Sequence, residues 1–272
     1  WDKTKKYSDD KQVDNKQVDN IEDLFFEFIR VAKDVQAKVI IGENVAGITM
    51  GTAREYFNRI VNGFGDIGYE AVGKVLNAAD YGTPQARQRC FFVAIRNDVM
   101  DDVGINFMNM ESTIYPDAHS KQPTLREAIE DIENDPEEEQ MLLDFVQGSF
   151  QKKWIELLPF SPPKHRKPSD PEFIEINPKQ SMFNMIRPAP DLPCPTLTQA
   201  GQKKGLSGVF HYNSNRKLTI KELKRVMGLP DDFKLQGDFD QQAERVGRMV
   251  APLMMKELSG NIYKNILCQL KK

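Results

Sequence analysis

The sequence predicts an α/β protein that combines part of a doubly wound sheet with a smaller domain of irregular structure. Apolar side chains recur at helical spacing in residues 24–37, and a short β-branched run follows at residues 38–42. A second helical pattern at residues 54–64 precedes two strand patterns, at residues 69–76 and 90–95. Alternating helices and strands are typical of a sheet covered by helices, so we expect functional side chains at the strand ends.

The first sheet element is the run at residues 38–42, whose composition is typical of a buried parallel strand. Glu43 and Asn44 follow it immediately, at the expected end of that strand. The motif GFGDIG at residues 63–68 matches GxGxxG, but it closes a helix and precedes a strand. A phosphate-binding loop needs the opposite order, so we interpret these glycines as a helix end and a turn.

The character of the chain changes after residue 97. Acidic residues crowd residues 127–139, prolines cluster at residues 159–171, and helical periodicity is clear only near residues 125–132 and 141–158. This composition predicts a separate, irregular domain. Beyond it, a helix is expected at residues 218–227, stopped by Gly228 and Pro230, and a last helical region at residues 241–267, interrupted near Gly247 and Pro252.

Composition excludes several classes of protein. The 272 residues are 40% hydrophobic and 28% charged, with a net charge of −3, which is enough apolar content to bury a core. No run approaches the roughly 18 apolar residues of a membrane span, and no secretory signal is visible, so we expect a soluble cytoplasmic protein. Three cysteines without CxxC spacing and three histidines argue against a metal site. A duplicated pentapeptide at residues 11–20 is expected to lie in a solvated loop.

Three segments carry the chemistry: ENV at residues 43–45, QARQR at residues 85–89 and RKLTIKELKRVMGLPD at residues 216–231. Taken alone, a glutamate at a strand end is often a capping or salt-bridging group. Two alternating arginines are often surface charges on one face of a strand. Three such segments in this order and at this spacing are not expected to occur together by chance.

Together the segments resemble the C5-cytosine DNA methyltransferases, over residues 20–97 and 187–265. In that family, segments of these types flank a variable target-recognition domain. The resemblance implies a Rossmann-like, S-adenosylmethionine-dependent methyltransferase sheet. It also implies methyl transfer to carbon 5 of a flipped cytosine in duplex DNA, as in restriction-modification systems.

The resemblance assigns roles to the polar residues of the first two segments. Attack of a cysteine on carbon 6 of the cytosine requires a proton or hydrogen bond at N3, which a carboxylic acid in a dry pocket supplies. By resemblance, Glu43 is that acid, and Asn44 helps to shape its turn. Arg89 would stabilise the charge on the ring oxygen, Arg87 would hold Glu43 in place, and Gln85 would join their hydrogen-bonded group.

A further segment, residues 187–198, resembles the region of the family that precedes the recognition helix. By this resemblance, Thr196 lies near the flipped nucleotide or its phosphate. The alternative is a turn in which threonine hydroxyls bond the local backbone.

The family's glycine-rich methyl-donor loop and its Pro-Cys-Gln nucleophile loop have no counterpart in this sequence. Cys194 is in the wrong place to be the nucleophile, and Cys90 and Cys268 are expected to be buried. We therefore expect a carboxyl-terminal part of an enzyme, inactive alone and partnered by an amino-terminal half. Near the chain end, Arg248 replaces the family's usual asparagine, and with Met249 and Val250 it is expected to contact the donor's carboxylate.

The resemblance suggests three parts: residues 1–97 as half of the catalytic domain, residues 98–239 as the recognition domain, and residues 240–272 as a helix returning to the first. A non-catalytic DNA-binding module and a transfer-RNA methyltransferase remain alternatives. Basic residues are candidate phosphate contacts, although each can equally be an ordinary surface charge. They are Lys164, Arg166, Lys167, Lys203, Lys204, Arg216 and Lys217.

Overall fold

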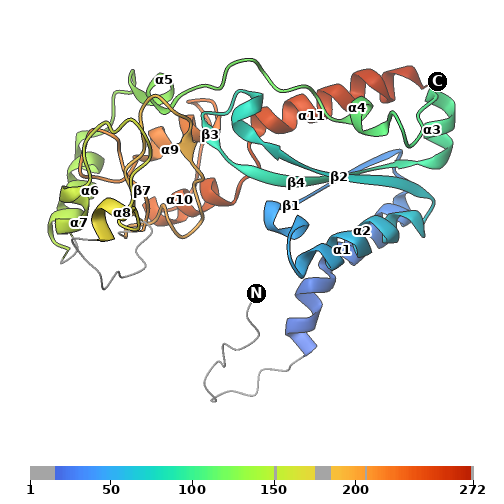
Figure 1. The fold of residues 1–272 in the computed structure, drawn as a ribbon, viewed down its shortest axis with the longest axis horizontal. Helices are drawn as coiled ribbons and strands as arrows, with labels where there is room; N and C mark the ends of the chain where they lie inside the picture. The colour runs from blue at the N-terminus through green and yellow to red at the C-terminus, as the bar shows by residue number, and fades with distance from the viewer. Residues whose placement is uncertain (1–15, 150–151, 175–184, 206, 271–272) are drawn as a thin grey trace.

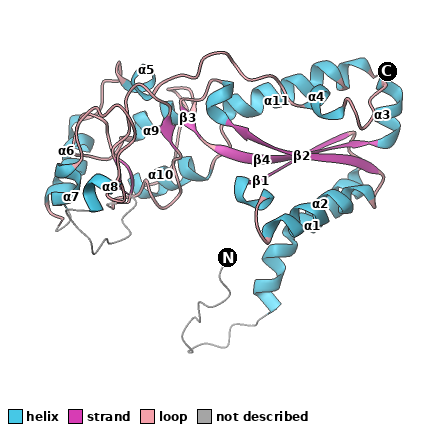
Figure 2. Cartoon of the chain, viewed as in Figure 1, coloured by secondary structure: helices cyan, strands magenta, loops and turns pink. Residues whose placement is uncertain are grey.

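A computed structural model describes residues 16–149, 152–174, 185–205 and 207–270 (Figure 1). One half of the molecule holds a three-stranded sheet with helices on both faces, and the other half consists of short helices and loops (Figure 2). This arrangement confirms a mixed α/β fold with a smaller irregular part.

The sheet has the order β1-β4-β2, formed by β1 (Val39–Val45), β4 (Gln88–Arg96) and β2 (Tyr69–Asn77). Both outer strands run antiparallel to β4, so the parallel orientation expected for residues 38–42 is wrong within this sheet. The reason is that helices cover both faces. Burial on both faces selects apolar side chains whichever way the neighbouring strand runs.

Side chains of the central strand alternate between two cores. Phe92 and Ala94 pack into a cluster with α1 (Lys16–Val35) and α2 (Ala53–Gly65). Phe91, Val93 and Ile95 face the larger core, which includes residues of α11 (Pro252–Asn265). This alternation is the period of two expected for a strand covered on both sides.

The GFGDIG segment makes the turn that the sequence predicted. The helix α2 ends at Gly65, Gly68 adopts a left-handed conformation with φ of 85°, and β2 begins at Tyr69. A residue with a Cβ is strained at that φ, which explains a glycine there without a bound phosphate.

Residues 97–115, near the expected start of the recognition domain at residue 98, pack against the sheet half. The helices α3 (Asn97–Val103) and α4 (Met110–Ile114) lie beside the sheet and α11 (Figure 1). Met110, Ile114 and Tyr115 belong to the core under β4, and the Tyr115 hydroxyl donates to the Phe91 carbonyl at 2.8 Å.

The second half begins after this segment and is built from short elements. They are α5 (Leu125–Ile129), α6 (Pro136–Gln147), α7 (Lys152–Leu157), α8 (Pro171–Ile174), β5 (Met185–Ile186), β7 (Gly208–Val209), α9 (Ile220–Met227) and α10 (Phe239–Arg248). The predicted break near Gly247 and Pro252 is confirmed, because α10 ends at Arg248 and α11 begins at Pro252. The helix expected over residues 141–158 is instead two helices, α6 and α7.

The two halves are joined by a shared core and by a strand pair. Leu197, Leu223 and Val246 belong to the same apolar cluster as Phe91. In addition, β3 (Gln85–Ala86) pairs in parallel with β6 (Cys194–Pro195). The 3-10 helices η1 (Ala46–Thr49), η2 (Ala78–Tyr81) and η3 (Leu267–Gln269) complete the fold.

The duplicated pentapeptide was expected to lie in a loop, but only part of it can be compared with that prediction. Its second copy, residues 16–20, begins α1, and the first copy lies outside the described residues. Within the described ranges, no helix has the length and apolarity required to cross a bilayer.

Candidate functional site

Glu43 and Arg89 form an ion pair on one face of the β1–β4 pair. The Arg89 Nε lies 2.8 Å from the Glu43 Oε1, and the two side chains are 16% and 30% exposed, respectively. In the register, Arg89 is opposite Val45, two residues beyond Glu43, so both side chains project to the same face. Burial lowers the pKa of Arg89 and the Glu43 charge opposes that effect. The predicted meeting of these two groups is therefore present at an accessible position.

The resemblance suggested that Arg87 holds Glu43 in place. In the structure Arg87 lies close by but binds other groups. It is fully buried, and its Nη1 and Nη2 donate to the carbonyls of Leu197 at 2.8 Å and Gly247 at 3.0 Å. Burial and the charge of Arg89 lower the pKa of Arg87 to about 10, while Glu43 opposes this shift. Arg87 precedes the first residue of β4, so strand alternation does not fix its direction, and it points to the other half of the molecule.

Gln85 completes this connection from the neighbouring strand. Its Oε1 accepts from the Leu197 backbone N–H at 3.0 Å, so Gln85 and Arg87 bind the two sides of one residue. Neither Leu197 nor Gly247 was predicted from the sequence, because both take part through backbone atoms that carry no side-chain signal.

Asn44 and Thr196 both hydrogen-bond backbone groups of the chain. The Asn44 Oδ1 accepts from the Val45 N–H at 2.8 Å, and Asn44 lies within β1, so its turn-shaping role stays a prediction. The Thr196 hydroxyl donates to the Ala86 carbonyl at 2.7 Å. Thr196 therefore bonds across to β3 rather than to its own turn, and the neighbouring Thr198 makes the local bond, accepting from the Gly201 N–H at 3.1 Å.

None of the three cysteines of this chain sits as a nucleophile beside Glu43. Burial and the Glu43 charge raise the pKa of Cys90 to about 12, and burial raises that of Cys194 further. The thiolate is the reactive form, so both are inert. Cys268 was expected to be buried in a helix, but it is exposed in η3, because the apolar face of α11 ends before it.

The expected donor contacts lie at the end of α10. Arg248 is exposed and ion-paired with Glu244, whereas Met249 and Val250 are half-buried against the larger core. An exposed guanidinium can bind a carboxylate, and the contact of these three residues with the methyl donor stays a prediction.

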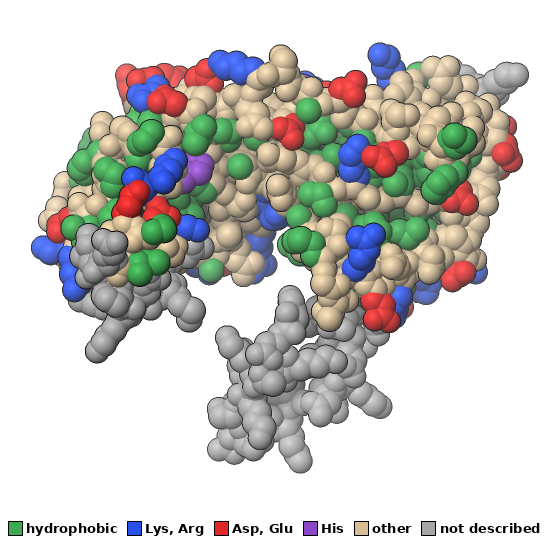
Figure 3. Space-filling view, viewed as in Figure 1, with side chains coloured by type: hydrophobic (Ala, Val, Ile, Leu, Met, Phe, Trp, Pro, Cys, Tyr) green, Lys and Arg blue, Asp and Glu red, His purple; other side chains and the backbone are tan. Residues whose placement is uncertain are grey.

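Four of the seven candidate phosphate contacts are at the surface, whereas the Arg166 side chain is only 16% exposed. Lys164 and Arg166 pair with Glu172, Lys203 pairs with Glu244, and Lys167 and Lys204 are exposed. Basic and acidic side chains are interspersed on the face shown in Figure 3, which also shows a hollow between the two halves with basic side chains along its wall.

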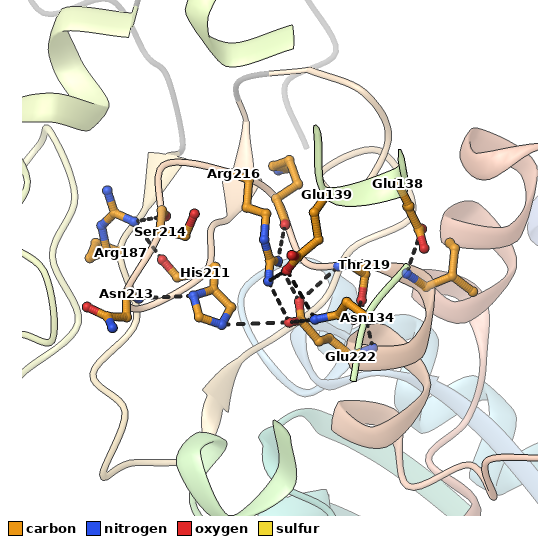
Figure 4. Close-up of polar contacts among 12 residues, drawn as sticks. Asn134, Glu138, Glu139, Arg187, His211, Asn213, Ser214, Arg216, Thr219 and Glu222 are labelled. Carbon is orange, nitrogen blue, oxygen red and sulfur yellow. Dashed lines mark hydrogen bonds and ion pairs between the residues drawn. The ribbon is translucent and has the colours of Figure 1, made fainter. Parts of the chain in front are cut away.

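Arg216 and Lys217 are enclosed, contrary to the expected phosphate contacts. They are 4% and 1% exposed. Arg216 binds both Glu222 oxygens at 2.8 and 2.9 Å and also Glu139 (Figure 4). The hydrogen bonds and charge of Arg216 hold the pKa of Glu222 below its usual value, although burial alone would raise it. Groups within the chain hold both side chains inward: carboxylates bind Arg216, and backbone carbonyls bind Lys217.

The motif that contains Arg216 is therefore mainly structural. Thr219 and Glu222 form a capping box at the start of α9, and the Thr219 hydroxyl donates to Asn134 (Figure 4). Gly228 ends α9 in the left-handed conformation, with φ of 78°. Burial lowers the pKa of His211, which also faces Glu222, to about 4. The motif's spacing is that of a capped helix with a buried ion pair.

Lys217 provides a pH-dependent prediction. Its Nζ donates to the carbonyls of Gly201 at 2.5 Å and Ser207, and burial lowers its pKa to about 7 from an ordinary 10.5. Between these values the unfolded chain binds more protons than the folded one, so stability rises with pH by up to about 1.4 kcal/mol per unit.

We expect this rise from pH 7 to pH 10 in urea unfolding of the chain, and a flatter profile for Lys217→Met. The exposed Lys204→Met serves as a control and is expected to keep the slope of the unmodified chain. Equal slopes for the unmodified chain and Lys217→Met would contradict the assigned pKa.

A family model for C-5 cytosine-specific DNA methylases matches residues 11–264. The chain belongs to that family. Members of the family use S-adenosylmethionine as the methyl donor, and the match spans the ion pair, the buried motif and both halves of the fold.

Two curated relatives illustrate the similarity. The type II methyltransferase M1.HphI of Haemophilus parahaemolyticus is 30% identical over 89% of this chain and 60% of its own length. M.Eco47II of Escherichia coli is 29% identical over 92% of this chain and 59% of its own length. The chain thus spans about three fifths of the length of these relatives.

Solved structures support the same fold. A protein described as a DNA modification methyltransferase, encoded within an Escherichia coli prophage, matches with a TM-score of 0.62 and 18% identity over 92% of this chain and 75% of that one. The Dnmt2 methyltransferase of S. pombe matches with a TM-score of 0.55 and 17% identity, over 88% of this chain and 71% of that one. The α/β methyltransferase fold expected from the resemblance is confirmed, with a small sheet in the described residues.

Proposed function

We propose that this chain forms part of a DNA (cytosine-5-)-methyltransferase, which moves a methyl group from S-adenosylmethionine to carbon 5 of a cytosine flipped out of duplex DNA. The observation that carries this proposal is the Glu43–Arg89 ion pair, which lies on one face of the β1–β4 pair with both side chains partly exposed. S-adenosylmethionine supplies the electrophilic methyl group when it is bound.

The geometry separates the roles of the two side chains. The Arg89 Nε binds Glu43, and its Nη1 donates to the Gln88 carbonyl at 2.7 Å. Within the described part of the chain, the Nη2 atom makes no hydrogen bond. It is the atom that would stabilise the ring oxygen of the base, while the carboxyl of Glu43, fixed by Nε, holds or delivers the proton at N3.

We propose that the thiol nucleophile comes from an amino-terminal half outside the described residues, since Cys90 and Cys194 are inert and Cys268 lies in η3. We propose that such a half docks on the edge of β1 and on α1, which packs on the face of the sheet opposite to Glu43. Among the strands that the structure describes, β1 is paired on one edge only, with β4. The adjacent helix exposes an apolar stripe at helical spacing, formed by Leu24, Phe28, Val31 and Val35.

The hollow between the halves is the proposed path of the duplex. β1 and η1 border it in Figure 1, and Figure 3 shows the basic side chains along its wall. Exposed Lys164, Lys167 and Lys204, together with Lys203 and Arg166, are the candidate phosphate contacts, with Thr196 near the flipped nucleotide.

The test is complementation. We expect this chain, combined in trans with the amino-terminal segment of a family member that carries Pro-Cys-Gln, to transfer radiolabelled methyl groups from S-adenosylmethionine to duplex DNA. Arg89→Ala should lower the transfer rate about 100-fold or more, because a fixed oxyanion donor contributes on that scale.

The matched control is Arg54→Ala, an exposed arginine on α2, which is expected to transfer at the rate of the unmodified chain. Tight DNA binding without transfer, whichever amino-terminal segment is added, would instead identify a non-catalytic module. Preferred methylation of transfer RNA in a direct competition would change the substrate.

A further inference from the structure

A junction of three chain segments lies between the Glu43–Arg89 pair and the second half of the molecule. The first contains Gln85 and Arg87, the second is residues 194–199, and the third is Gly247 near the end of α10. The junction is dry: Gln85, Arg87 and Leu197 are at most 1% exposed.

Hydrogen bonds in this junction hold residues 194–197 along residues 84–87. The Cys194 N–H donates to the Pro84 carbonyl at 3.0 Å, and the Thr196 hydroxyl donates to the Ala86 carbonyl. Leu197 is bound at its N–H by Gln85 and at its carbonyl by Arg87. The segment therefore has little freedom to slide relative to β4, which carries Arg89.

The second guanidinium nitrogen of Arg87 extends the junction to α10 through the Gly247 carbonyl. A Cβ at Gly247 would lie 2.6 Å from the backbone of Thr198 and from that of Gln199. These contacts are with backbone rather than with a flexible side chain, so a methyl group there must displace the chain. Glycine is required at this position by close approach of the segment.

The next residues, Thr198, Gln199 and Ala200, emerge from the junction exposed. We infer that Gly247, together with Arg87 and Gln85, is a positioning residue that fixes this exposed segment, residues 198–200, relative to the Glu43–Arg89 pair. This inference rests on the proposed function. It assigns to Gly247 a role through backbone contact, distinct from binding of the methyl donor by Arg248.

The physical reason is the geometry that a flipped base requires. Its ring must meet Glu43 and Arg89 while its flanking nucleotides are held by the second half, and an error of about 1 Å between the two can lower a rate 100-fold. Displacing residues 198–199 should therefore slow the chemical step more than it weakens DNA binding.

The experiment compares Gly247→Ala with Gly260→Ala, a glycine of α11 whose Cβ would meet nothing within 4 Å. Hydrogen exchange is measured on the chain itself. Gly247→Ala should raise exchange of the Leu197 amide at least 10-fold, while the amides of α9 and α11 keep their protection. Gly260→Ala should leave the Leu197 amide unchanged.

Kinetics are then measured on the complemented enzyme. The single-turnover rate of Gly247→Ala should fall at least 10-fold, with the Kd for duplex DNA changed less than about 3-fold. Gln85→Met, which removes the acceptor for the Leu197 N–H without adding bulk, should show the same split if Gly247→Ala fails to fold.

The outcomes separate the two proposals. Unchanged Leu197 exchange in Gly247→Ala, or faster exchange with an unchanged rate, would overturn the positioning role. Equal losses in the single-turnover rate and in DNA affinity would show that the junction only maintains the fold, and would exclude the positioning role. If the unmodified complemented enzyme transfers no methyl group, the proposed function is overturned, and the positioning role in catalysis with it. Hydrogen exchange at the Leu197 amide would still test whether Gly247 holds the junction together.

Discussion

Replacing Glu43 by glutamine in the complemented enzyme is expected to lower methyl transfer about 100- to 10,000-fold, because general acid–base catalysis contributes on that scale. Glutamine keeps the shape of the side chain and can still accept from the Arg89 Nε, but it cannot give up a proton to N3. The measurement is the single-turnover rate at saturating DNA, together with the Kd for the duplex.

The affinity for DNA should change little, since Glu43 meets the base only after it has been flipped. Glu70→Gln is the matched control, because Glu70 is exposed on β2 and makes no ion pair among the described residues. A Glu43→Gln enzyme that retains more than a tenth of the rate would rule out the proposed role of this carboxyl.

Breaking the buried ion network at Arg216 is expected to cost about 3–5 kcal/mol of unfolding free energy. Arg216→Met leaves the carboxylate of Glu222, which is 1% exposed, without its bidentate partner, and also releases Glu139. Desolvated charge without a partner is far more costly than a surface charge. Urea unfolding of the chain measures the effect.

The same motif contains its own control. Arg225 pairs with Asp231 at the surface, with side chains 31% and 65% exposed, so Arg225→Met should cost no more than about 1 kcal/mol. Similar losses for Arg216→Met and Arg225→Met would contradict the structural interpretation of the motif.

Local sequence patterns predicted most elements of the sheet half. The helix at residues 54–64, the strands at residues 69–76 and 90–95 and the turn at GFGDIG all lie within a few residues of α2, β2, β4 and the connection between them. Strong apolar periodicity and the position of glycines predicted these elements, and both signals are local in the sequence.

Local sequence patterns did not predict the direction of the first strand or the point at which the two halves divide. The run at residues 38–42 is apolar because both faces of the sheet are covered, a property that parallel and antiparallel strands share. Residues 98–115 have weak periodicity, and their place beside α11 depends on Met110, Ile114 and Tyr115 meeting the core under β4.

The candidate site shows the same division. Glu43 and Arg89 were nominated by motif, and their contact at 2.8 Å agrees with that nomination. Arg87, Arg216 and Lys217 have the charge expected of substrate-binding groups, yet they are buried and bind carbonyls or carboxylates within the chain. Charge is visible in a sequence, whereas burial depends on segments that lie far apart in it.

By itself the sequence determined the family and the pair of side chains proposed for the chemistry, because order and spacing of residue types are properties of the chain. Only the tertiary structure decided which cations are buried, which cysteines are inert, and that Gly247 approaches residues 198–199. Those properties arise from distant backbone segments brought into contact, and a glycine or a peptide carbonyl carries no sign of its partner until the chain has folded.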